Sequence, residues 1–550
     1  MKVVTTATAE TPVRELDTDV LIVGYGPVGA ALTALLGGYG VRTLVIDRES
    51  DVMEHPRAIA LDNEALRVLQ LVGLAEDAFD KVVIPQVRMH CPYLREFARI
   101  NTTGSIDGHP KLVTFFQPQL ERALRQKAEE FAAVTAQSAT ELLSFSQQRD
   151  HVVAELKLPS GVTQKVRCQY LIGADGASSM VRNAIGQAFT GQTYAQDWLI
   201  VDARDVPEPM DHVEFLCNHR RPAPHMVAPG NRQRWEFMLQ PGETAEEMLR
   251  DERISELLAP WGMPDQITIE RKAVYRFHSR CATRFVDGRV LLVGDAAHIT
   301  PPFAGQGLVA GLRDAANLGW KLAWAVQGRA SASIVESYDT ERRPHARAMI
   351  RLARLMGRLI MPQSAFAAML IHGAMRAGRL FPPLRRLVDE LEIKPANRFR
   401  RGLFAKLSGG SALRTGGQFP QAFVRGPDGQ IVLSDDVLGR GFSLVGFGLN
   451  PYRFLSDAMR IRLHALDIHV LCVQPRGQGA EPDCDTLEDV SNGLLPTAAP
   501  RGWFALVRPD RVVMQAGPAE QMEKLLDQAL SLLGSPEPSS ISASLSEVLS

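Results

Sequence analysis

Hydrophobic residues near the start of the chain form one long uncharged run that glycines interrupt. The run covers residues 20–41 and is long enough to cross a bilayer, but it holds six glycines and a proline. We therefore predict three consecutive elements: a buried strand in TDVLIVGYG, a tight turn at its glycines, and a helix in VGAALTALLGGYG that packs on a sheet.

The pattern then alternates between strands and helices up to residue 175. RTLVIDR predicts a second strand, which completes a βαβ unit, and residues 151–175 predict a hairpin that leads into a third core strand. Helical periodicity covers residues 56–79 and 115–131. This order is typical of an α/β fold with a Rossmann-like parallel sheet.

Residues 190–285 have a different pattern, in which short β-like runs alternate with turns. We predict a mixed β-sheet substrate domain at 186–285, joined by part of 85–118 and inserted into a discontinuous dinucleotide-binding domain at 18–185 and 286–400. A third unit at 401–535 contains the strands GFSLVGF, IHVLCVQP and WFALVRP and a last helix at 521–533. The Ser-rich end, 536–550, is expected to be disordered.

Composition narrows the class of protein. The 550 residues are too many for one core and predict two to four domains. The formal net charge of −1 gives no sign of a nucleic-acid or membrane partner. Six scattered cysteines without a CxxC argue against a zinc site, a redox dithiol and a disulfide scaffold. The first 17 residues lack an apolar core, so we predict no signal peptide and a cytoplasmic location.

The motif Gly24-Tyr25-Gly26-Pro27-Val28-Gly29 predicts dinucleotide binding. The first glycine permits a tight turn, the second lets the backbone approach a pyrophosphate, and the third lets helix and strand pack closely. Asp47 ends the second strand, 18 residues past Gly29, where it can accept a hydrogen bond from an adenosine ribose. A solvated acid at a strand end is the alternative interpretation.

Two further motifs occur later in the chain. Asp175-Gly176 follows the strand YLIGA, where a simple turn is the alternative. Gly294-Asp295 ends the strand RVLLVG, and Asp295 could bind a ribityl hydroxyl or could merely cap a helix. The following PPFAGQG supplies backbone N–H groups beside a helix N-terminus, which can stabilise negative charge on a reduced flavin. Together the three motifs indicate FAD.

This order of motifs resembles the class A single-component FAD aromatic hydroxylases, the para-hydroxybenzoate hydroxylase-like superfamily, over roughly residues 17–400. Pro56, Arg57, Ala58 and Gln117 fall where that family has flavin-contacting residues. HPRAIALDNEALRVLQLVGL, EFMLQPGET and ERRPHARAMI are similar to its 3-(3-hydroxyphenyl)propionate hydroxylase branch. That branch has a C-terminal thioredoxin-like domain without active cysteines, and WFALVRPDRVV is similar to its closing strands.

The resemblance implies the reaction. NADH or NADPH reduces FAD, O₂ adds at C4a to give a hydroperoxide, and an electrophilic oxygen attacks a ring carbon ortho or para to a phenolate. No second nucleotide motif is visible, which agrees with transient nicotinamide binding. The expected partners are a small aromatic substrate and O₂, with a homodimer as a further expectation. The expected cofactor-binding residues are Gly24, Gly26, Pro27, Gly29, Asp47, Arg48, Arg57, Gln117, Asp175, Gly294, Asp295, Pro302, Gly305, Gly307 and Leu308.

A ring hydroxyl must lose a proton, so a base or a proton relay is expected. The candidates are His225, Tyr275, His278 and His298, of which His225 and Tyr275 are our catalytic assignments. Arg220 or Arg221 could pair with a substrate carboxylate, and Trp235 could stack on the ring. Each also has an ordinary structural interpretation. The expected substrate-binding residues are Arg221, His225, Trp235 and Phe303.

The chain departs from the 3-(3-hydroxyphenyl)propionate hydroxylases at two positions. A tryptophan is expected where Phe303 stands, and an aromatic residue where Ala223 stands. Both positions lie near the expected face between flavin and substrate. We therefore expect a substrate that is 3-(3-hydroxyphenyl)propionate-like or another phenol or catechol, including a nitro- or halo-substituted one.

Other classes of protein remain as alternatives. WKLAW at 320–324 does not match the WxWxIP motif expected of a flavin-dependent halogenase, and a disulfide-type flavin reductase needs a CxxC. An FAD-linked alkene reductase and a flavin-binding scaffold without turnover stay open. Substrate-stimulated oxidation of NAD(P)H would separate an enzyme from a scaffold.

Overall fold

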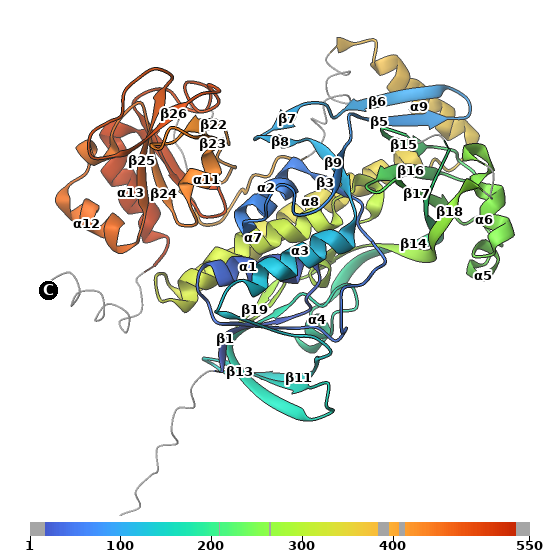
Figure 1. The fold of residues 1–550 in the computed structure, drawn as a ribbon, viewed down its shortest axis with the longest axis horizontal. Helices are drawn as coiled ribbons and strands as arrows, with labels where there is room; N and C mark the ends of the chain where they lie inside the picture. Colours follow the sequence, from blue (N-terminus) through green and yellow to red (C-terminus); the bar gives the residue numbers. More distant parts are fainter. Residues whose placement is uncertain (1–16, 208–209, 263–265, 383–394, 406–412, 535–550) are drawn as a thin grey trace, which may run out of the picture.

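The computed structural model describes residues 17–207, 210–262, 266–382, 395–405 and 413–534. Figure 1 shows a central block of helices α1, α2 and α7, with the C-terminal unit on one side and the sheet that contains β14 and β18 on the other. The predicted tail at 536–550 lies outside the described residues.

The first sheet is the predicted Rossmann-like sheet. Its order is β10-β2-β1-β13-β12-β11, with β20 beside β13 and β19 beside β20. The first strand pairs in parallel with β2 and β13, and almost all of it is buried, which explains its continuous apolar run. The strands are β1 (Thr18–Val23), β2 (Thr43–Ile46), β10 (Val134–Gln137), β11 (Glu141–Gln147), β12 (Val152–Lys157), β13 (Thr163–Gly173), β19 (Val286–Asp287) and β20 (Val290–Leu292).

The helices of the first block lie close to their predicted positions. One differs: helix α2 begins only at Asn63, because Asp62 caps it by accepting from the Ala65 N–H at 2.9 Å and residues 60–62 form a short strand. The helices are α1 (Pro27–Gly38), α2 (Asn63–Val72), α3 (Gln117–Glu129), α4 (Met180–Ala184), α7 (Gly307–Val326), α8 (Ser337–Ile360) and α9 (Ala365–Gly378). Within the described ranges, no helix is long and apolar enough to cross a membrane.

The second sheet has the order β21-β18-β14-β17-β16-β15-β5-β6, so two strands from the segment before residue 118 join it. One face packs on the short helices α5 (Ala245–Met248) and α6 (Asp251–Leu258). The strands are β5 (Gln86–Cys91), β6 (Arg95–Asn101), β14 (Phe189–Arg204), β15 (Val213–Leu216), β16 (Ala223–Ala228), β17 (Arg232–Met238), β18 (Thr268–Ala282) and β21 (His298–Ile299). A small sheet, β3 (Ala60–Asp62), β9 (Leu112–Phe115) and β4 (Lys81–Val83), and the hairpin β7 (Ser105–Ile106) and β8 (His109–Pro110) complete this region.

The C-terminal unit has a mixed sheet of order β23-β22-β26-β25-β24-β27-β28. Strands β24, β25 and β26 are parallel neighbours, whereas β27 and β28 run antiparallel. The elements are β22 (Phe423–Arg425), β23 (Ile431–Leu433), α11 (Ser434–Leu438), β24 (Ser443–Phe447), α12 (Asp457–Ala465), β25 (His469–Pro475), β26 (Asp485–Asp489), β27 (Trp503–Val507), β28 (Val513–Pro518) and α13 (Met522–Ser531).

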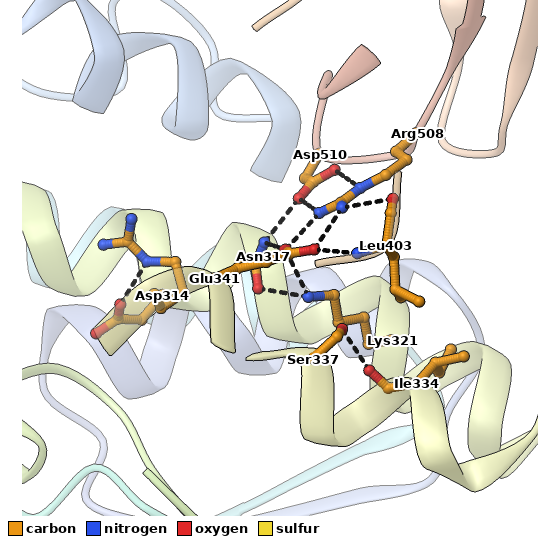
Figure 2. A network of polar contacts seen from close by, with 10 residues as sticks. Asp314, Asn317, Lys321, Ile334, Ser337, Glu341, Leu403, Arg508 and Asp510 are labelled. Carbon is orange, nitrogen blue, oxygen red and sulfur yellow. Dashed lines mark hydrogen bonds and ion pairs between the residues drawn. The ribbon is translucent and has the colours of Figure 1, made fainter. Parts of the chain in front are cut away.

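A buried polar network joins this unit to the central helices (Figure 2). Arg508 donates two hydrogen bonds, at 2.8 and 2.9 Å, to the carboxylate of Glu341 on α8, which also accepts from Lys321 on α7 at 2.8 Å. Asp510 accepts from Arg508 and from Asn317 on α7. The charges offset one another, which is the condition under which buried ions are tolerated.

Candidate cofactor and substrate site

The turn after β1 has a backbone shape that requires glycine. Gly24 has φ +104°, and a Cβ there would lie 2.5 Å from the Ala174 carbonyl oxygen. A Cβ on Gly29 would lie 2.0 Å from the carbonyl oxygen of Gly24, whereas a Cβ on Gly26 would meet nothing within 4 Å. Open space therefore remains beside Gly26, where α1 begins at Pro27. This cradle fits a pyrophosphate on a helix N-terminus.

Asp47 follows β2, and its carboxylate turns back toward the glycine turn. Its oxygens accept from the Tyr25 N–H at 2.7 Å and from the Glu49 N–H at 2.9 Å. An ionised carboxylate has about four acceptor sites, so ribose hydroxyls can still bind. Arg48 points elsewhere: it is 77% exposed and pairs with Glu49 at 3.3 Å on the surface.

The segment Pro56-Arg57-Ala58 is held from two sides. Gln117 Oε1 accepts from the N–H groups of Arg57 and Ala58, both at 2.8 Å. From the second sheet, Arg234 donates to the carbonyl oxygens of Arg57 and Pro56 at 2.9 and 2.8 Å. The segment is therefore held between α3 and the second sheet, and Arg57 itself is exposed.

The Gly294-Asp295 turn is locked by Asp314 of α7. One oxygen of Asp314 accepts from the Gly294 N–H at 3.1 Å and from His298 Nε2 at 2.6 Å, and the other accepts from Arg342 at 2.8 Å. His298 is therefore buried in this network, and its contacts favour a structural role over a catalytic one.

Asp295 itself has no hydrogen bond in the described parts of the chain, so the helix-cap alternative is not realised. Burial raises the pKa of its carboxyl, and the charges of His298 and Arg57 oppose the rise. Arg57 and Asp295, which are far apart in the sequence, therefore act on one site. An unpartnered carboxylate at the end of a buried strand fits the role of accepting from a ribityl hydroxyl.

The loop after this turn leads into α7, a helix of which most residues are buried. Pro302 begins the 3₁₀ turn η4 (Pro302–Ala304), Gly305 has φ +62°, and Gly307 and Leu308 open α7. The N-terminus of a 20-residue helix carries partial positive charge. It lies where negative charge on a reduced flavin is expected.

Asp175 is placed differently from the other expected cofactor ligands. Its Oδ2 accepts from the Val181 N–H at 3.1 Å at the start of α4, while Oδ1 is buried without a partner in the described chain. The turn interpretation accounts for one oxygen and leaves the other available.

An aromatic cluster adjoins the Pro302–Gly307 loop. The Phe303 ring is edge-on to the rings of Tyr194, Trp198 and Phe277, with centroids 5.7, 5.9 and 6.0 Å away. Tyr275 packs at its border. Of the predicted catalytic and substrate-binding residues that the structure describes, only Tyr275 and Phe303 belong to this cluster.

His225 and Trp235 lie on the opposite face of the second sheet. Both are fully buried, their rings stack at 4.5 Å, and Trp261 packs edge-on against them. His225 Nε2 lies 2.6 Å from Gln233 Oε1. The structure therefore places both residues in a core against α6, away from the cofactor turn.

The remaining candidates have partners of their own. Arg221 donates to the Met238 carbonyl at 2.9 Å and to Glu243 at 2.5 Å, so its guanidinium is already used. Arg220 is exposed, and His278 lies 3.0 Å from the Thr193 hydroxyl. In the described residues, no group of three His, Cys, Asp or Glu side chains could hold a metal ion.

The buried position of His225 predicts a pH effect on stability. Burial lowers its pKa to about 4, opposed by the hydrogen bond to Gln233. The unfolded chain takes up this proton below about pH 6.5, so stability present above that pH should be lost between pH 6.5 and 4, by roughly 3 kcal/mol. Urea unfolding at several pH values would show a flatter dependence for His225→Gln, and unchanged FAD content. An equally steep dependence in the variant would contradict the assignment.

Residues that no motif indicated also shape the site. Asp202 pairs with Arg234 at 2.6 Å and with Arg271 at 3.3 Å, and both arginines contact the Pro56 carbonyl. The signal was present in RQRWEFM, where polar and aromatic residues alternate and so must face opposite sides of a strand. The sequence alone did not show which side of this strand faces the cofactor.

The chain is similar to known protein families and to named relatives. Residues 17–353 match the family model described as an FAD binding domain, and residues 416–532 match the HcaD C-terminal domain. The 3-(3-hydroxy-phenyl)propionate/3-hydroxycinnamic acid hydroxylase of Escherichia coli O139:H28 is 34% identical over 532 residues, or 94% of each chain.

Solved structures share the fold. The flavin-dependent monooxygenase PieE in complex with FAD and substrate has a TM-score of 0.79 at 22% identity, covering 95% of this chain and 100% of that one. Aklavinone-11 hydroxylase with FAD and aklavinone has a TM-score of 0.75 at 24% identity, covering 94% and 99%.

Proposed function

The chain belongs to the FAD-dependent aromatic hydroxylases, and on this premise we propose that it hydroxylates a phenolic or catecholic ring ortho or para to a hydroxyl, with NAD(P)H and O₂. The expected setting is the degradation of aromatic compounds. The substrate is 3-(3-hydroxyphenyl)propionate-like or a nitro- or halo-substituted phenol or catechol.

One observation carries the proposal: the loop expected to bind the flavin contributes a ring to an aromatic cluster. Phe303 belongs to that loop, and its neighbours Trp198 and Phe277 come from the second sheet. Aromatic rings prefer edge-to-face and offset contacts with one another, so this cluster favours a flat ring beside the cofactor. Its burial also supports exclusion of water from the reacting atoms.

The chain's own groups would hold FAD by distinct contacts. Gly26 leaves room for the pyrophosphate, Asp47 accepts from the ribose, and Asp295 accepts from the ribityl chain. Arg57 is available for an anionic part of the cofactor or for NAD(P)H. The bound flavin supplies the activation of O₂, and the protein orients the ring to be attacked.

A substrate carboxylate needs a cation other than Arg221. On α8, Arg354 and Arg358 act on the pKa of Tyr194, which burial raises and these charges lower. We propose Arg358 as the partner of a propionate-like side chain, because Arg354 already donates to Gln192 at 2.7 Å.

The C-terminal unit is proposed to be thioredoxin-like. Supporting features are the βαβ unit of β24, α12 and β25, followed by the β27–β28 hairpin and α13. Its expected role is to stabilise the enzyme or to support a homodimer. The domain limits 18–185 with 286–400, 186–285 and 401–535 stay predictions.

The experiment is NAD(P)H oxidation by the FAD-loaded protein across a panel of phenols. The panel contains 3-(3-hydroxyphenyl)propionate, hydroxybenzoates, chlorophenols and nitrocatechols, with peroxide assayed in parallel. Stimulated oxidation with a hydroxylated product and little peroxide is expected for the true substrate. Stimulated oxidation that yields only peroxide would identify a compound with the right ring and the wrong substituents. If no phenol stimulates oxidation, a reductase or a scaffold would be favoured.

Asp295→Ala should weaken FAD binding roughly ten- to hundredfold, since a hydrogen bond to a charged group contributes about 1.5–3 kcal/mol. Fluorescence titration of the apoprotein with FAD measures the change. Asp211→Ala, which changes an exposed carboxylate of the second domain, is the control. Equal affinities of the two variants would remove Asp295 from the site.

A further inference from the structure

One carboxyl group in the second sheet has no structural partner. Glu236 lies on β17 with only 7% of its surface exposed, and no donor in the described residues binds its carboxylate. An ionised or neutral carboxyl buried without a hydrogen bond is costly, so its position calls for a function.

Strand alternation shows which way Glu236 points. Its neighbours Trp235 and Phe237 pack in the core against α6, so Glu236 belongs to the opposite face. On that face, Arg234 contacts the carbonyl oxygens of Pro56 and Arg57, and Met238 packs on the cluster that contains Phe303.

Glu236 therefore lies midway between two parts of the cofactor site. Residues 234 and 238 are about 13 Å apart along an extended strand. One end of this span touches the Pro56-Arg57-Ala58 segment and the other touches the aromatic cluster. The register continues across the sheet, because Glu236 pairs with Ile200 on β14, and Ile200 pairs with Ala273 on β18. Glu236 is the ionisable group of this middle row.

From this geometry we propose that Glu236 is the base that takes the proton from the ring hydroxyl of the substrate. The inference rests on the proposed function. The O–H bond of the ring breaks, an O–H bond forms on a carboxylate oxygen of Glu236, and the electron pair stays on the ring oxygen. No redox change accompanies this step, and the proton returns to water when the product leaves.

The electrostatics agree with this role. Burial raises the pKa of Glu236 to about 7, with Arg234 lowering it, Asp202 raising it and Arg271 lowering it. These are the charged groups of the three adjacent strands that act on it. A base works best when its pKa lies near the working pH, and the nearby arginines also favour a phenolate.

The charged groups that act on Glu236 also line a cavity. A cavity of about 300 Å³ is lined by Asp202, Arg234, Arg271 and Glu270, among others, and lies beside the Pro56–Ala58 segment. Glu270, which also lines the cavity, has 23% of its side chain exposed.

The test compares FAD-loaded wild type with Glu236→Gln, Glu236→Asp and the exposed control Glu246→Gln. A substrate from the panel is bound across pH 5.5–9, and the absorbance of the bound ring reports phenol or phenolate. In wild type the ring should ionise near neutral pH, well below the value of about 10 for a free phenol. In Glu236→Gln the bound phenol should lose its proton about 10²–10⁴-fold more slowly after rapid mixing at pH 7, and turnover at pH 7 should fall by the same factor. FAD content should stay unchanged, and Glu236→Asp should restore part of both effects.

A second measurement protects the test against a variant that fails to fold. In wild type, infrared difference spectra should show one carboxyl group gaining a proton when the phenol binds. An unchanged rate of phenolate formation in Glu236→Gln, or no carboxyl protonation in wild type, would overturn the inference while leaving the hydroxylase function intact. If wild type oxidises no phenol, the proposed function fails as well. The two failures are therefore distinguished by the activity of wild type.

Discussion

Gly29→Ala is expected to purify without FAD. The added Cβ would lie 2.0 Å from the carbonyl oxygen of Gly24, and real Cβ atoms do not approach backbone that closely. Helix α1 must therefore move away from β1, which displaces the N–H groups expected to bind the pyrophosphate. The flavin absorbance per protein measures the loss, which should be at least a hundredfold in affinity, or about 3 kcal/mol.

Two further glycine variants separate a shift of the protein backbone from a direct clash with the ligand. Gly26→Ala meets no protein atom, so it should fold normally and lose affinity only because its methyl group enters the space for the ligand. Gly479→Ala, which also meets nothing and lies in an exposed loop, should bind FAD like wild type. Full occupancy in Gly29→Ala would show that the turn does not hold the cofactor.

Glu341→Ala is expected to cost about 3–5 kcal/mol of stability, the range for breaking a buried ion pair. The change leaves the buried cations Lys321 and Arg508 without their shared carboxylate, and removes the acceptor for the Leu403 N–H (Figure 2). Burial alone would raise the pKa of Glu341, but Arg508 and Lys321 hold it well below its usual range. Calorimetry and urea unfolding followed by circular dichroism measure the loss.

The control is an ion pair in the same C-terminal unit that solvent reaches. Arg462 pairs with Asp527 at 2.7 Å, with 40% and 68% of the side chains exposed. Arg462→Ala should change stability by no more than about 1 kcal/mol. If Glu341→Ala unfolded like this control, the network would not hold the two units together.

The amino-acid sequence by itself determined the cofactor-binding turn. Gly24, Gly29 and Asp47 lie within one βαβ unit, and steric limits on a short backbone segment leave few alternatives. Three local motifs likewise indicated the family, and each of them follows a strand and lies at or before a helical element. Asp295 could be found this way but not distinguished from a helix cap.

Only the tertiary structure decided what surrounds the substrate. His225 and Glu236 both lie on strands of the second sheet, yet one is enclosed against Trp235 and the other faces the cofactor side. Composition does not determine which face of a strand is covered, since that depends on the elements packed on each side. The partners of Arg221 and Asp314 were equally invisible, because residues 22 and 28 positions away provide them. Local backbone geometry depends on residues that are neighbours in the sequence, whereas burial and ion pairing depend on contacts between residues that are distant in the sequence.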